Sequence, residues 1–227
     1  MEFLREILWQ VAPIRYFFEN ISRIFTYTQN HLELTLVGVI LAIILWVSVG
    51  IIIYRYPKLS HGVLGIASIV MCIPSIALYG ILLTLPGFGL GRTSALTALV
   101  LYAMLPIVRN VFVALRSVDP SILDAAKGMG MSKQEVLWEV QIPNALPTIF
   151  AGVRVALVMM VGIATLATYI GEQNLGRLIQ HGITRTHPTM IIVGAVVVSI
   201  IAIGIDLLMG LLGKHLISKG LQLEESK

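Results

Sequence analysis

Residues 34–53, LTLVGVILAIILWVSVGIII, decide the fold of this chain. The stretch holds 20 residues without a charge, and its apolar side chains would cover every face of a helix. A helix of ~20 apolar residues crosses the ~30 Å hydrocarbon layer of a bilayer. A strand of a membrane barrel would instead alternate apolar and polar residues over ~10 positions, which this stretch does not do. The stretch therefore predicts a membrane-spanning α-helix.

The composition of the whole chain is typical of a membrane protein. Hydrophobic residues make up 57% of the 227 residues, charged residues only 12%, and the mean hydropathy is +0.89. A soluble domain carries about 25% charged residues, so this chain lacks the charge for a water-facing surface. We expect an all-α membrane protein with five transmembrane helices. They fall at about residues 34–54, 62–85, 94–116, 146–170 and 189–213.

The charge balance and the rare residue types exclude several classes of site. The 16 Lys and Arg against 12 Asp and Glu give a net charge of +4. In a membrane protein this excess reports orientation and contact with lipid headgroups, and no basic patch interleaved with aromatics indicates nucleic acid. The single cysteine, Cys72, excludes an internal disulfide and a paired-thiolate site. The five histidines lack ligand spacing, so we expect no bound metal.

The N-terminal 30 residues predict an amphipathic helix on the membrane surface. Hydrophobic residues recur there with helical spacing, but charges interrupt them and Pro13 breaks the pattern. No 18-residue stretch in this segment is free of charge, which argues against a sixth span. We therefore expect an interfacial segment at 1–30, a transmembrane domain at 31–215 with a cytoplasmic loop at 119–143, and a cytoplasmic tail at 216–227.

The one long polar stretch is DAAKGMGMSKQEVLWEVQIP, residues 124–143. It must lie outside the lipid and contact something soluble. Asp119 before Pro120 supplies a helix N-cap followed by proline at the first helical position. We expect a helix from there to about Gly128. Gly130 is placed to adopt the left-handed conformation that ends a helix.

A second short helix is predicted directly after the first. Ser132 and Glu135 have the spacing of a capping box, in which each side chain bonds the other residue's backbone N–H. We expect this helix to reach Gln141, and Pro143 and Pro147 to end it before the fourth span. The caps alone fit an ordinary interfacial loop equally well. The spacing of the residues favours a loop that docks a partner.

That spacing resembles the EAA loop of ABC importer permeases. The matching residues are Asp124, Ala125, Ala126, Gly130, Val140, Ile142 and Pro143. Asp stands where the family usually has Glu, so the acid is one methylene shorter. The resemblance implies a coupling helix that inserts into a cleft of a nucleotide-binding subunit. The residues expected to make that contact are Asp124, Ala125, Ala126, Gly128, Gly130 and Ser132.

The resemblance covers about residues 30–215. Over this range the chain is similar to the permeases that import glycine betaine, carnitine or choline. It rests on IPSIALYGILLTLPGFGLG, LYAMLPIVRNVFVALRSVDPSILDAAKGMGMS and VGIATLATYIGEQNLGRLIQHGI. It implies the type I ABC importer permease fold and a pore subunit for an osmoprotectant solute. One departure is IGEQNLG at 170–176, where the family commonly has IGAGGLG. Bulkier, more polar residues are expected at the external end of the fourth span.

The resemblance also implies the partners. Two ABC ATP-binding subunits, a second permease subunit that is identical or homologous, and an extracytoplasmic solute-binding protein would assemble with this chain in the bacterial inner or plasma membrane. The chain has no GxxxxGK[ST] phosphate loop, so we expect no enzymatic activity and no cofactor of its own. ATP and Mg would bind in the partner ATPase.

Five residues are candidates for the transport pathway. Pro74 is expected to kink the second span, and the Ser75 hydroxyl to donate to a freed carbonyl, which suits a gate helix as well as a packing kink. Tyr79, Tyr102 and Tyr169 offer ring faces to a quaternary ammonium. The alternative for each tyrosine is an interface anchor or a buried hydroxyl.

Charged residues inside the spans are expected to be paired. Asp206 lies within the fifth span, where we favour pairing with a cation near the cytoplasmic face over a proton or substrate role. Arg154, just inside the fourth span, is expected to support the polar loop.

The cations predict the orientation. Nine of the 16 fall on the side of the polar loop and six on the other, with Arg154 inside a span. The cation-rich side is usually cytoplasmic, so we expect the N-terminus outside and the C-terminus inside. The alternative function is a stand-alone secondary transporter or channel, which predicts coupling carboxylates and an internal repeat. Only Asp206 is available, and no repeat is evident.

Overall fold

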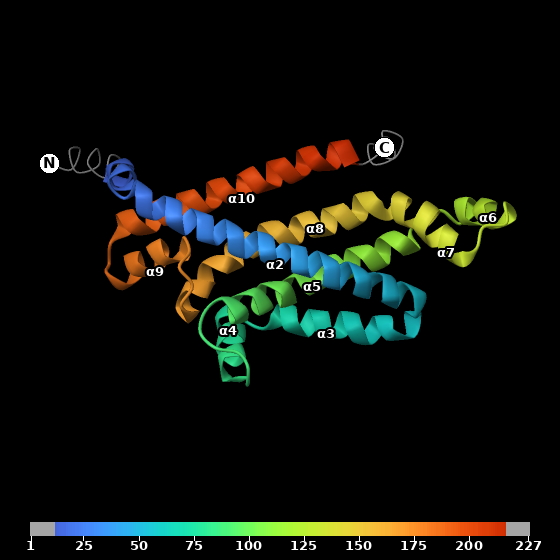
Figure 1. Ribbon diagram of the computed structural model, residues 1–227, viewed down its shortest axis with the longest axis horizontal. Coiled ribbons are helices and arrows are strands. Elements are labelled where there is room, and N and C mark those ends of the chain that lie inside the picture. Colours follow the sequence, from blue (N-terminus) through green and yellow to red (C-terminus); the bar gives the residue numbers. More distant parts are fainter. Residues whose placement is uncertain (1–11, 217–227) are drawn as a thin grey trace. The chain divides into compact units, whose positions relative to one another are not determined.

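The computed structural model describes residues 12–216, and every regular element in that range is helical (Figure 1). Residues 12–19 form a helix that precedes α2. The elements after it are α2 (Ile21–Arg55), η1 (Pro57–Leu59), α3 (Ser60–Cys72), α4 (Ser75–Thr84), α5 (Arg92–Arg116), α6 (Pro120–Gly128), α7 (Lys133–Glu135), η2 (Val136–Gln141), α8 (Ile142–Ala164), η3 (Thr165–Ile170), α9 (Gly176–Thr184) and α10 (Pro188–Leu216).

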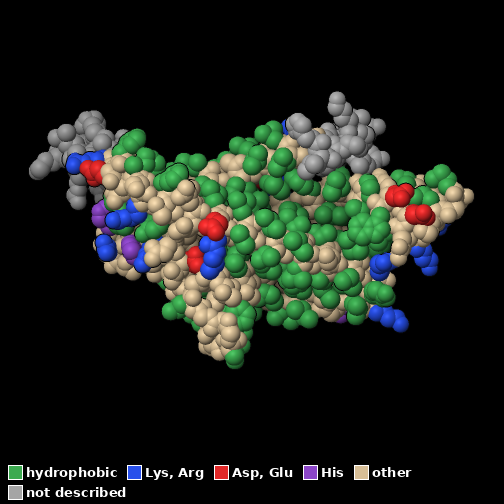
Figure 2. Space-filling model, in the orientation of Figure 1, with side chains coloured by type: hydrophobic (Ala, Val, Ile, Leu, Met, Phe, Trp, Pro, Cys, Tyr) green, Lys and Arg blue, Asp and Glu red, His purple; other side chains and the backbone are tan. Residues whose placement is uncertain are grey.

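Four helical stretches in the described range are long and apolar enough to span a membrane. They are Ile21–Arg55, Arg92–Arg116, Lys133–Ile170 and Pro188–Lys214. A fifth span results if the bent pair α3 and α4 crosses once, which gives the five spans expected. Many large hydrophobic side chains on these helices are exposed, and hydrophobic side chains cover much of the face seen in Figure 2. Such a surface is suited to lipid rather than to water.

The second span differs from the continuous helix expected at 62–85. Helix α3 ends at Cys72, and α4 begins at Ser75 with Pro74 as its N-cap residue. Proline removes a backbone donor and clashes with the preceding turn, so the helix is broken rather than kinked at this point. Ser75 is thus the first residue of a new helix.

The N-terminal boundary also differs from the one expected near residue 30. The helix over residues 12–19 ends in a turn at Asn20, and α2 then runs from Ile21 to Arg55 without interruption. The Asn20 side chain donates to the Tyr16 carbonyl at 3.0 Å and supports that turn. Residues 21–33 therefore belong to the first spanning helix. The surface location of the N-terminal segment stays a prediction, and residues 1–11 lie outside the described range.

The chain divides into two compact units, and each draws residues from several spanning helices. The first comprises residues up to 39, 73–100 and 158–205. Ile24, Leu175, Leu178 and Val193 form a buried cluster in it. This cluster joins the start of α2 to α9 and α10. Apolar packing therefore fixes the short helix α9 against two spanning helices.

The second unit comprises residues 40–72, 101–157 and those from 206 on. Helices α5 and α8 approach closely in it. A Cβ atom on Gly152 would lie 2.5 Å from the Asn110 Cβ atom and 2.8 Å from the Pro106 carbonyl oxygen. The Asn110 amide in turn donates to that carbonyl at 2.7 Å. Small residues at helix crossings in membranes allow such backbone contact.

The charged residues predicted to be paired within the spans form one ion pair in this unit. The Arg154 Nε atom donates to one Asp206 carboxylate oxygen at 2.6 Å, and Nη2 donates to the other at 2.7 Å. This bidentate geometry joins α8 to α10. The expected pairing of Asp206 with a cation is confirmed. The partner is Arg154, which contacts α10 rather than the polar loop.

We predict that replacing Arg154 with Leu lowers the thermal stability of the purified protein, because it leaves an ionised carboxylate without its cation within a spanning helix. The double variant Arg154→Leu, Asp206→Leu should recover most of this loss. Thermal unfolding in detergent and in lipid nanodiscs measures both. If the losses caused by Arg154→Leu alone and by Asp206→Leu alone add up to the loss in the double variant, the pair has no coupling energy.

Candidate functional site

Helix α6 of the polar loop begins where its caps predict. The Asp119 side chain accepts a hydrogen bond from the Ser121 backbone N–H at 2.8 Å, and Pro120 is the first helical residue. That bond to Ser121 holds the pKa of the Asp119 carboxyl below its usual value. The helix extends for 9 residues to Gly128. The predicted start and end of this helix are confirmed.

The end of α6 depends on a left-handed glycine. Gly130 has a φ of +85°, a conformation that costs other residues about 1 kcal/mol. Its N–H donates to the Lys127 carbonyl at 2.9 Å, and the Met131 N–H donates to the Ala126 carbonyl at 3.2 Å. These bonds satisfy carbonyls that the last helical turn leaves open. The turn predicted at Gly130 is confirmed.

The capping box after this turn is also confirmed, but the end of the second helix is not. The Ser132 hydroxyl accepts from the Glu135 N–H at 3.3 Å, and the Glu135 carboxylate accepts from the Ser132 N–H at 2.6 Å. The prediction that prolines end this helix is wrong. Helices α7, η2 and α8 follow one another without a break, and Pro143 and Pro147 lie inside α8.

A π-helical turn explains how the helix passes the prolines. In η2 the Ile142 N–H donates to the Leu137 carbonyl, five residues earlier. The Asn144 amide donates to the Val140 carbonyl at 2.7 Å and supports the turn after it. A π turn is wider than an α turn and so relieves the crowding that proline causes. The polar loop is therefore continuous with the fourth spanning helix.

The surface that α6 presents is small and mostly exposed. The helix packs on η2, and Ala126 is buried there at 2% exposure. Asp124 and Ala125 face outward, and Asp124 pairs with Lys127 at 3.0 Å. A solvent-exposed pair of this kind contributes little to stability, so it is free to exchange for a partner's charge. Gly128, Gly130 and Ser132 are exposed as well.

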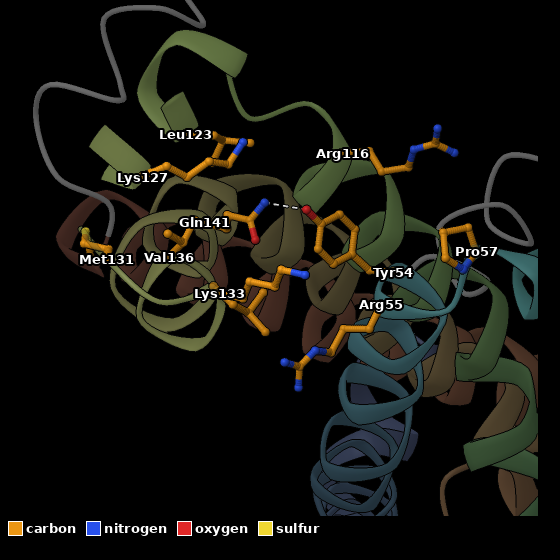
Figure 3. A pocket seen from close by; sticks show the side chains of 11 residues that line it. Tyr54, Arg55, Pro57, Arg116, Leu123, Lys127, Met131, Lys133, Val136 and Gln141 are labelled. Atoms are coloured by element: carbon orange, nitrogen blue, oxygen red, sulfur yellow. Dashed lines mark hydrogen bonds between the residues drawn. The ribbon is translucent and has the colours of Figure 1, made fainter. Parts of the chain in front are cut away.

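A cavity of about 610 Å³ lies behind α6 (Figure 3). Four cationic side chains line it, together with Tyr54 of α2 and Gln141 of η2. The Gln141 amide donates to the Tyr54 hydroxyl, as Figure 3 shows. This bond attaches the polar loop to the end of the first spanning helix. The cations are Arg55, Arg116, Lys127 and Lys133.

The segment where the sequence departs from its family is held by Asn174. Its side chain is fully buried, donates to the Ala164 carbonyl at 2.7 Å and accepts from the Gly176 N–H at 2.8 Å. The Asn30 amide adds a bond of 2.7 Å to the Gln173 carbonyl. Asn174 is therefore a structural residue that fixes the start of α9.

Glu172 lies in the same segment beside a second ion pair. Arg92 and Glu33 are 2.9 Å apart. Burial raises the pKa of the Glu172 carboxyl, Arg92 opposes the rise and Glu33 adds to it. The polar replacement at 172 thus creates a three-residue charged group in the first unit.

The five pathway candidates occupy different environments. Tyr79 is buried and donates its hydroxyl to the Ile163 carbonyl at 3.3 Å, and Tyr102 is buried as well. Tyr169 is 48% exposed and is the one of the three rings open to contact in a single chain. Pro74 and Ser75 mark the helix break. Their roles in transport stay predictions.

The chain matches the family described as binding-protein-dependent transport system inner membrane component over residues 35–219. This range includes the polar loop and all the spanning helices except the start of α2. The chain belongs to this permease family. The permease fold and the membrane location expected from the sequence are thereby confirmed.

Two relatives and one solved structure define the comparison further. The carnitine transport permease protein OpuCB of Listeria monocytogenes is 36% identical over 93% of this chain and 96% of its own length. The osmoprotectant import permease protein OsmW of Salmonella typhimurium is 41% identical over 92% and 99%. The inward-facing MetNI methionine ABC transporter shares the fold, with a TM-score of 0.76 at 21% identity over 87% and 98%.

Sequence reasoning missed the residues that attach the polar loop to its spanning helices. Tyr54 and Gln141 lie 87 positions apart, so no local pattern connects them. The segment that holds Asn174 was expected only to be bulkier and more polar, although the Asn174 side chain donates to the Ala164 carbonyl and accepts from the Gly176 N–H at the start of α9. A polar residue followed two positions later by glycine, before a helical stretch, was the available signal.

We predict that replacing Ser132 with Ala speeds hydrogen exchange of the α7 and η2 amides about fivefold, because losing an N-cap costs about 1 kcal/mol. Gln134→Ala, an exposed change in the same helix, serves as the control. Exchange measured by mass spectrometry on the purified permease tests this. Equal rates in both variants would show that the capping box does not stabilise the loop.

We predict that Glu172→Gln raises the thermal stability of the permease near pH 7.5. Burial raises the folded pKa of Glu172 above the unfolded value of about 4.3, so the ionised carboxylate destabilises the folded state. The gain should shrink as the pH falls through the folded pKa and vanish below about pH 4. Unfolding curves across this range test it, and a pH-independent gain would contradict the assignment.

Proposed function

We propose that the chain is the pore-forming subunit of an ATP-driven importer for a small quaternary-ammonium or related osmoprotectant solute. The observation that carries this is the similarity to permeases named for carnitine and osmoprotectant import, over more than nine-tenths of this chain. A further relative supports the same class of solute, since a choline transport system permease protein of Bacillus subtilis is 36% identical to this chain.

In this proposal energy enters through α6. Two ABC ATP-binding subunits would each grip the coupling helix of one permease, with Asp124 to Ser132 in the contact. The exposed face of Ala125 gives no side-chain bulk, which suits insertion into a protein cleft. ATP and Mg would bind only in the ATPase, because this chain carries no phosphate-loop motif.

The contacts of α6 support a rigid transfer of its movement to the membrane. The helix packs on η2, which continues into α8, and Gln141 of η2 bonds Tyr54 of α2. A push on α6 would therefore reach two spanning helices together. Rigid-body movement of spanning helices is a common way for transporters to expose a site to either side.

The remaining partners follow from the same proposal. A second permease, identical or homologous, would complete the pore, and an extracytoplasmic binding protein would deliver the solute. The polar loop would face the cytoplasm, with the N-terminus outside and the C-terminus inside. A stand-alone secondary transporter is disfavoured, because the one intramembrane carboxylate noted in the sequence is neutralised by Arg154.

We predict that Ala125→Trp prevents assembly with the ATP-binding subunit, because the indole would be too large for α6 to enter the cleft of that subunit. Co-purification and solute uptake in proteoliposomes should fall at least tenfold. Lys58→Trp, an exposed change in the loop after α2, should leave both unchanged. Unaltered thermal stability of the two variants excludes misfolding.

Two outcomes would count against the proposal. Full assembly and uptake by Ala125→Trp would show that α6 is not the coupling helix. Solute-driven currents from the isolated chain in liposomes would favour the secondary transporter. Competition of glycine betaine, carnitine and choline for uptake identifies the solute class, and failure of all three would exclude the proposed cargo.

A further inference from the structure

A second cationic cavity lies in the first unit, and no residue of the polar loop lines it. It has a volume of about 570 Å³. Arg177 and His181 line it from one face of α9, at the i, i+4 spacing of a helix, and Arg185 lines it as the C-cap residue of the same helix. Arg23 lines it from α2. Figure 2, in the orientation of Figure 1, shows arginine and histidine side chains gathered around α9.

The positive charge of this cavity is not compensated by the described part of the unit. The described carboxylates there are Glu19, Glu33 and Glu172. Glu19 pairs with Arg15 at 2.7 Å, and Glu33 pairs with Arg92, beside Glu172. No carboxylate in the described range forms an ion pair with the arginines of the cavity. They are Arg23, Arg177 and Arg185.

The arginines of the cavity also act on His181, which lies between Arg177 and Arg185 in the sequence. Burial lowers the pKa of His181, and Arg177, Arg185 and Arg23 lower it further. Clustered cations of this kind repel one another, so an anion in the cavity would stabilise the arrangement. Arginine is suited to phosphate, because its planar fork donates two parallel hydrogen bonds.

An apolar groove adjoins the cationic cavity. It has a volume of about 320 Å³, and only hydrophobic residues line it. Ile14, Phe17 and Phe18 come from the helix over residues 12–19, and the opposite wall comes from α10. The two hollows share both of these helices. On the first helix, Tyr16 lines the cavity and the next residue, Phe17, lines the groove. On α10, Met190 lines the cavity and Ile192 lines the groove.

The cationic cavity lies near the ends of two spanning helices. Arg23 is near the start of spanning helix α2, and His187 directly precedes spanning helix α10. The ends of spanning helices lie at the level of the headgroups. The Tyr16 and His187 rings, 5.9 Å apart, join the two helices at the same level. Aromatic rings prefer this interfacial depth.

We propose that the cationic cavity and the apolar groove form a binding site for one anionic phospholipid, with its phosphate among the arginines and an acyl chain in the groove. The arginine forks suit the phosphate of a lipid headgroup, and the groove supplies the apolar contact that a free anion does not need. The proposal goes beyond transport and depends neither on the solute nor on the ATPase.

Native mass spectrometry of the purified full chain in neutral detergent tests the site. After delipidation, the protein is titrated with phosphatidylglycerol and with phosphatidylcholine of the same acyl chains. The wild type should bind one phosphatidylglycerol at least tenfold more tightly. Each of Arg177→Gln and Arg185→Gln should weaken binding about fivefold. Lys58→Gln, an exposed cation that lines neither hollow, should have no effect.

A second pair of variants tests the groove. Val196→Trp fills it and should weaken phosphatidylglycerol binding severalfold. Ile203→Trp, at a similarly exposed position on α10 outside the groove, should not. Thermal unfolding in detergent confirms that each variant is folded.

Four results would overturn the proposal. They are equal binding of the two lipids, unchanged binding by the arginine variants, unchanged binding by Val196→Trp, and binding of inorganic phosphate as tight as that of the lipid. If the arginine variants kept their lipid but lost stimulation by a solute-binding protein, the cavity would be a protein docking surface instead.

Discussion

Lipid offers no hydrogen-bond partner to a peptide group, and this constraint underlies every element of the permease. Each spanning segment must bond its own backbone, so every regular element of the described chain is a helix. Where a helix is interrupted, another group satisfies the backbone. Pro74 opens a new helix at a clean break, whereas Pro143 is passed by a π turn. The same constraint makes charges rare within the spans and pairs Arg154 with Asp206.

The sequence was most informative where the physics is local. Runs of apolar residues predicted the spans, and the caps at Asp119, Gly130 and Ser132 predicted the first loop helix and the start of the second. These features depend on neighbours within four residues, so they can be read from a short window. The family and its fold followed from the spacing in this loop together with the runs at 73–91, 101–132 and 161–183. They did not require any knowledge of how distant helices meet.

Local reasoning failed where several residues share one constraint. Proline was expected to end the second loop helix, because a single proline removes one bond and crowds one turn. A widened turn together with the Asn144 side chain relieves both problems, and only the folded chain shows this. The Tyr54–Gln141 bond, the cavity beside α9 and the groove beside α10 join residues far apart in sequence. No periodicity records such contacts.

The π turn in η2 also sets the rotation of the fourth spanning helix relative to the polar loop. A π turn contains one residue more than an α turn needs, and one residue corresponds to about 100° of rotation around a helix. Every side chain of α8 is therefore rotated by about that amount relative to the capping box at Ser132. The extra residue in the turn sets which face of α8 lies on the same side as the capping box, and a relative with a different residue count there would present another face of the same helix.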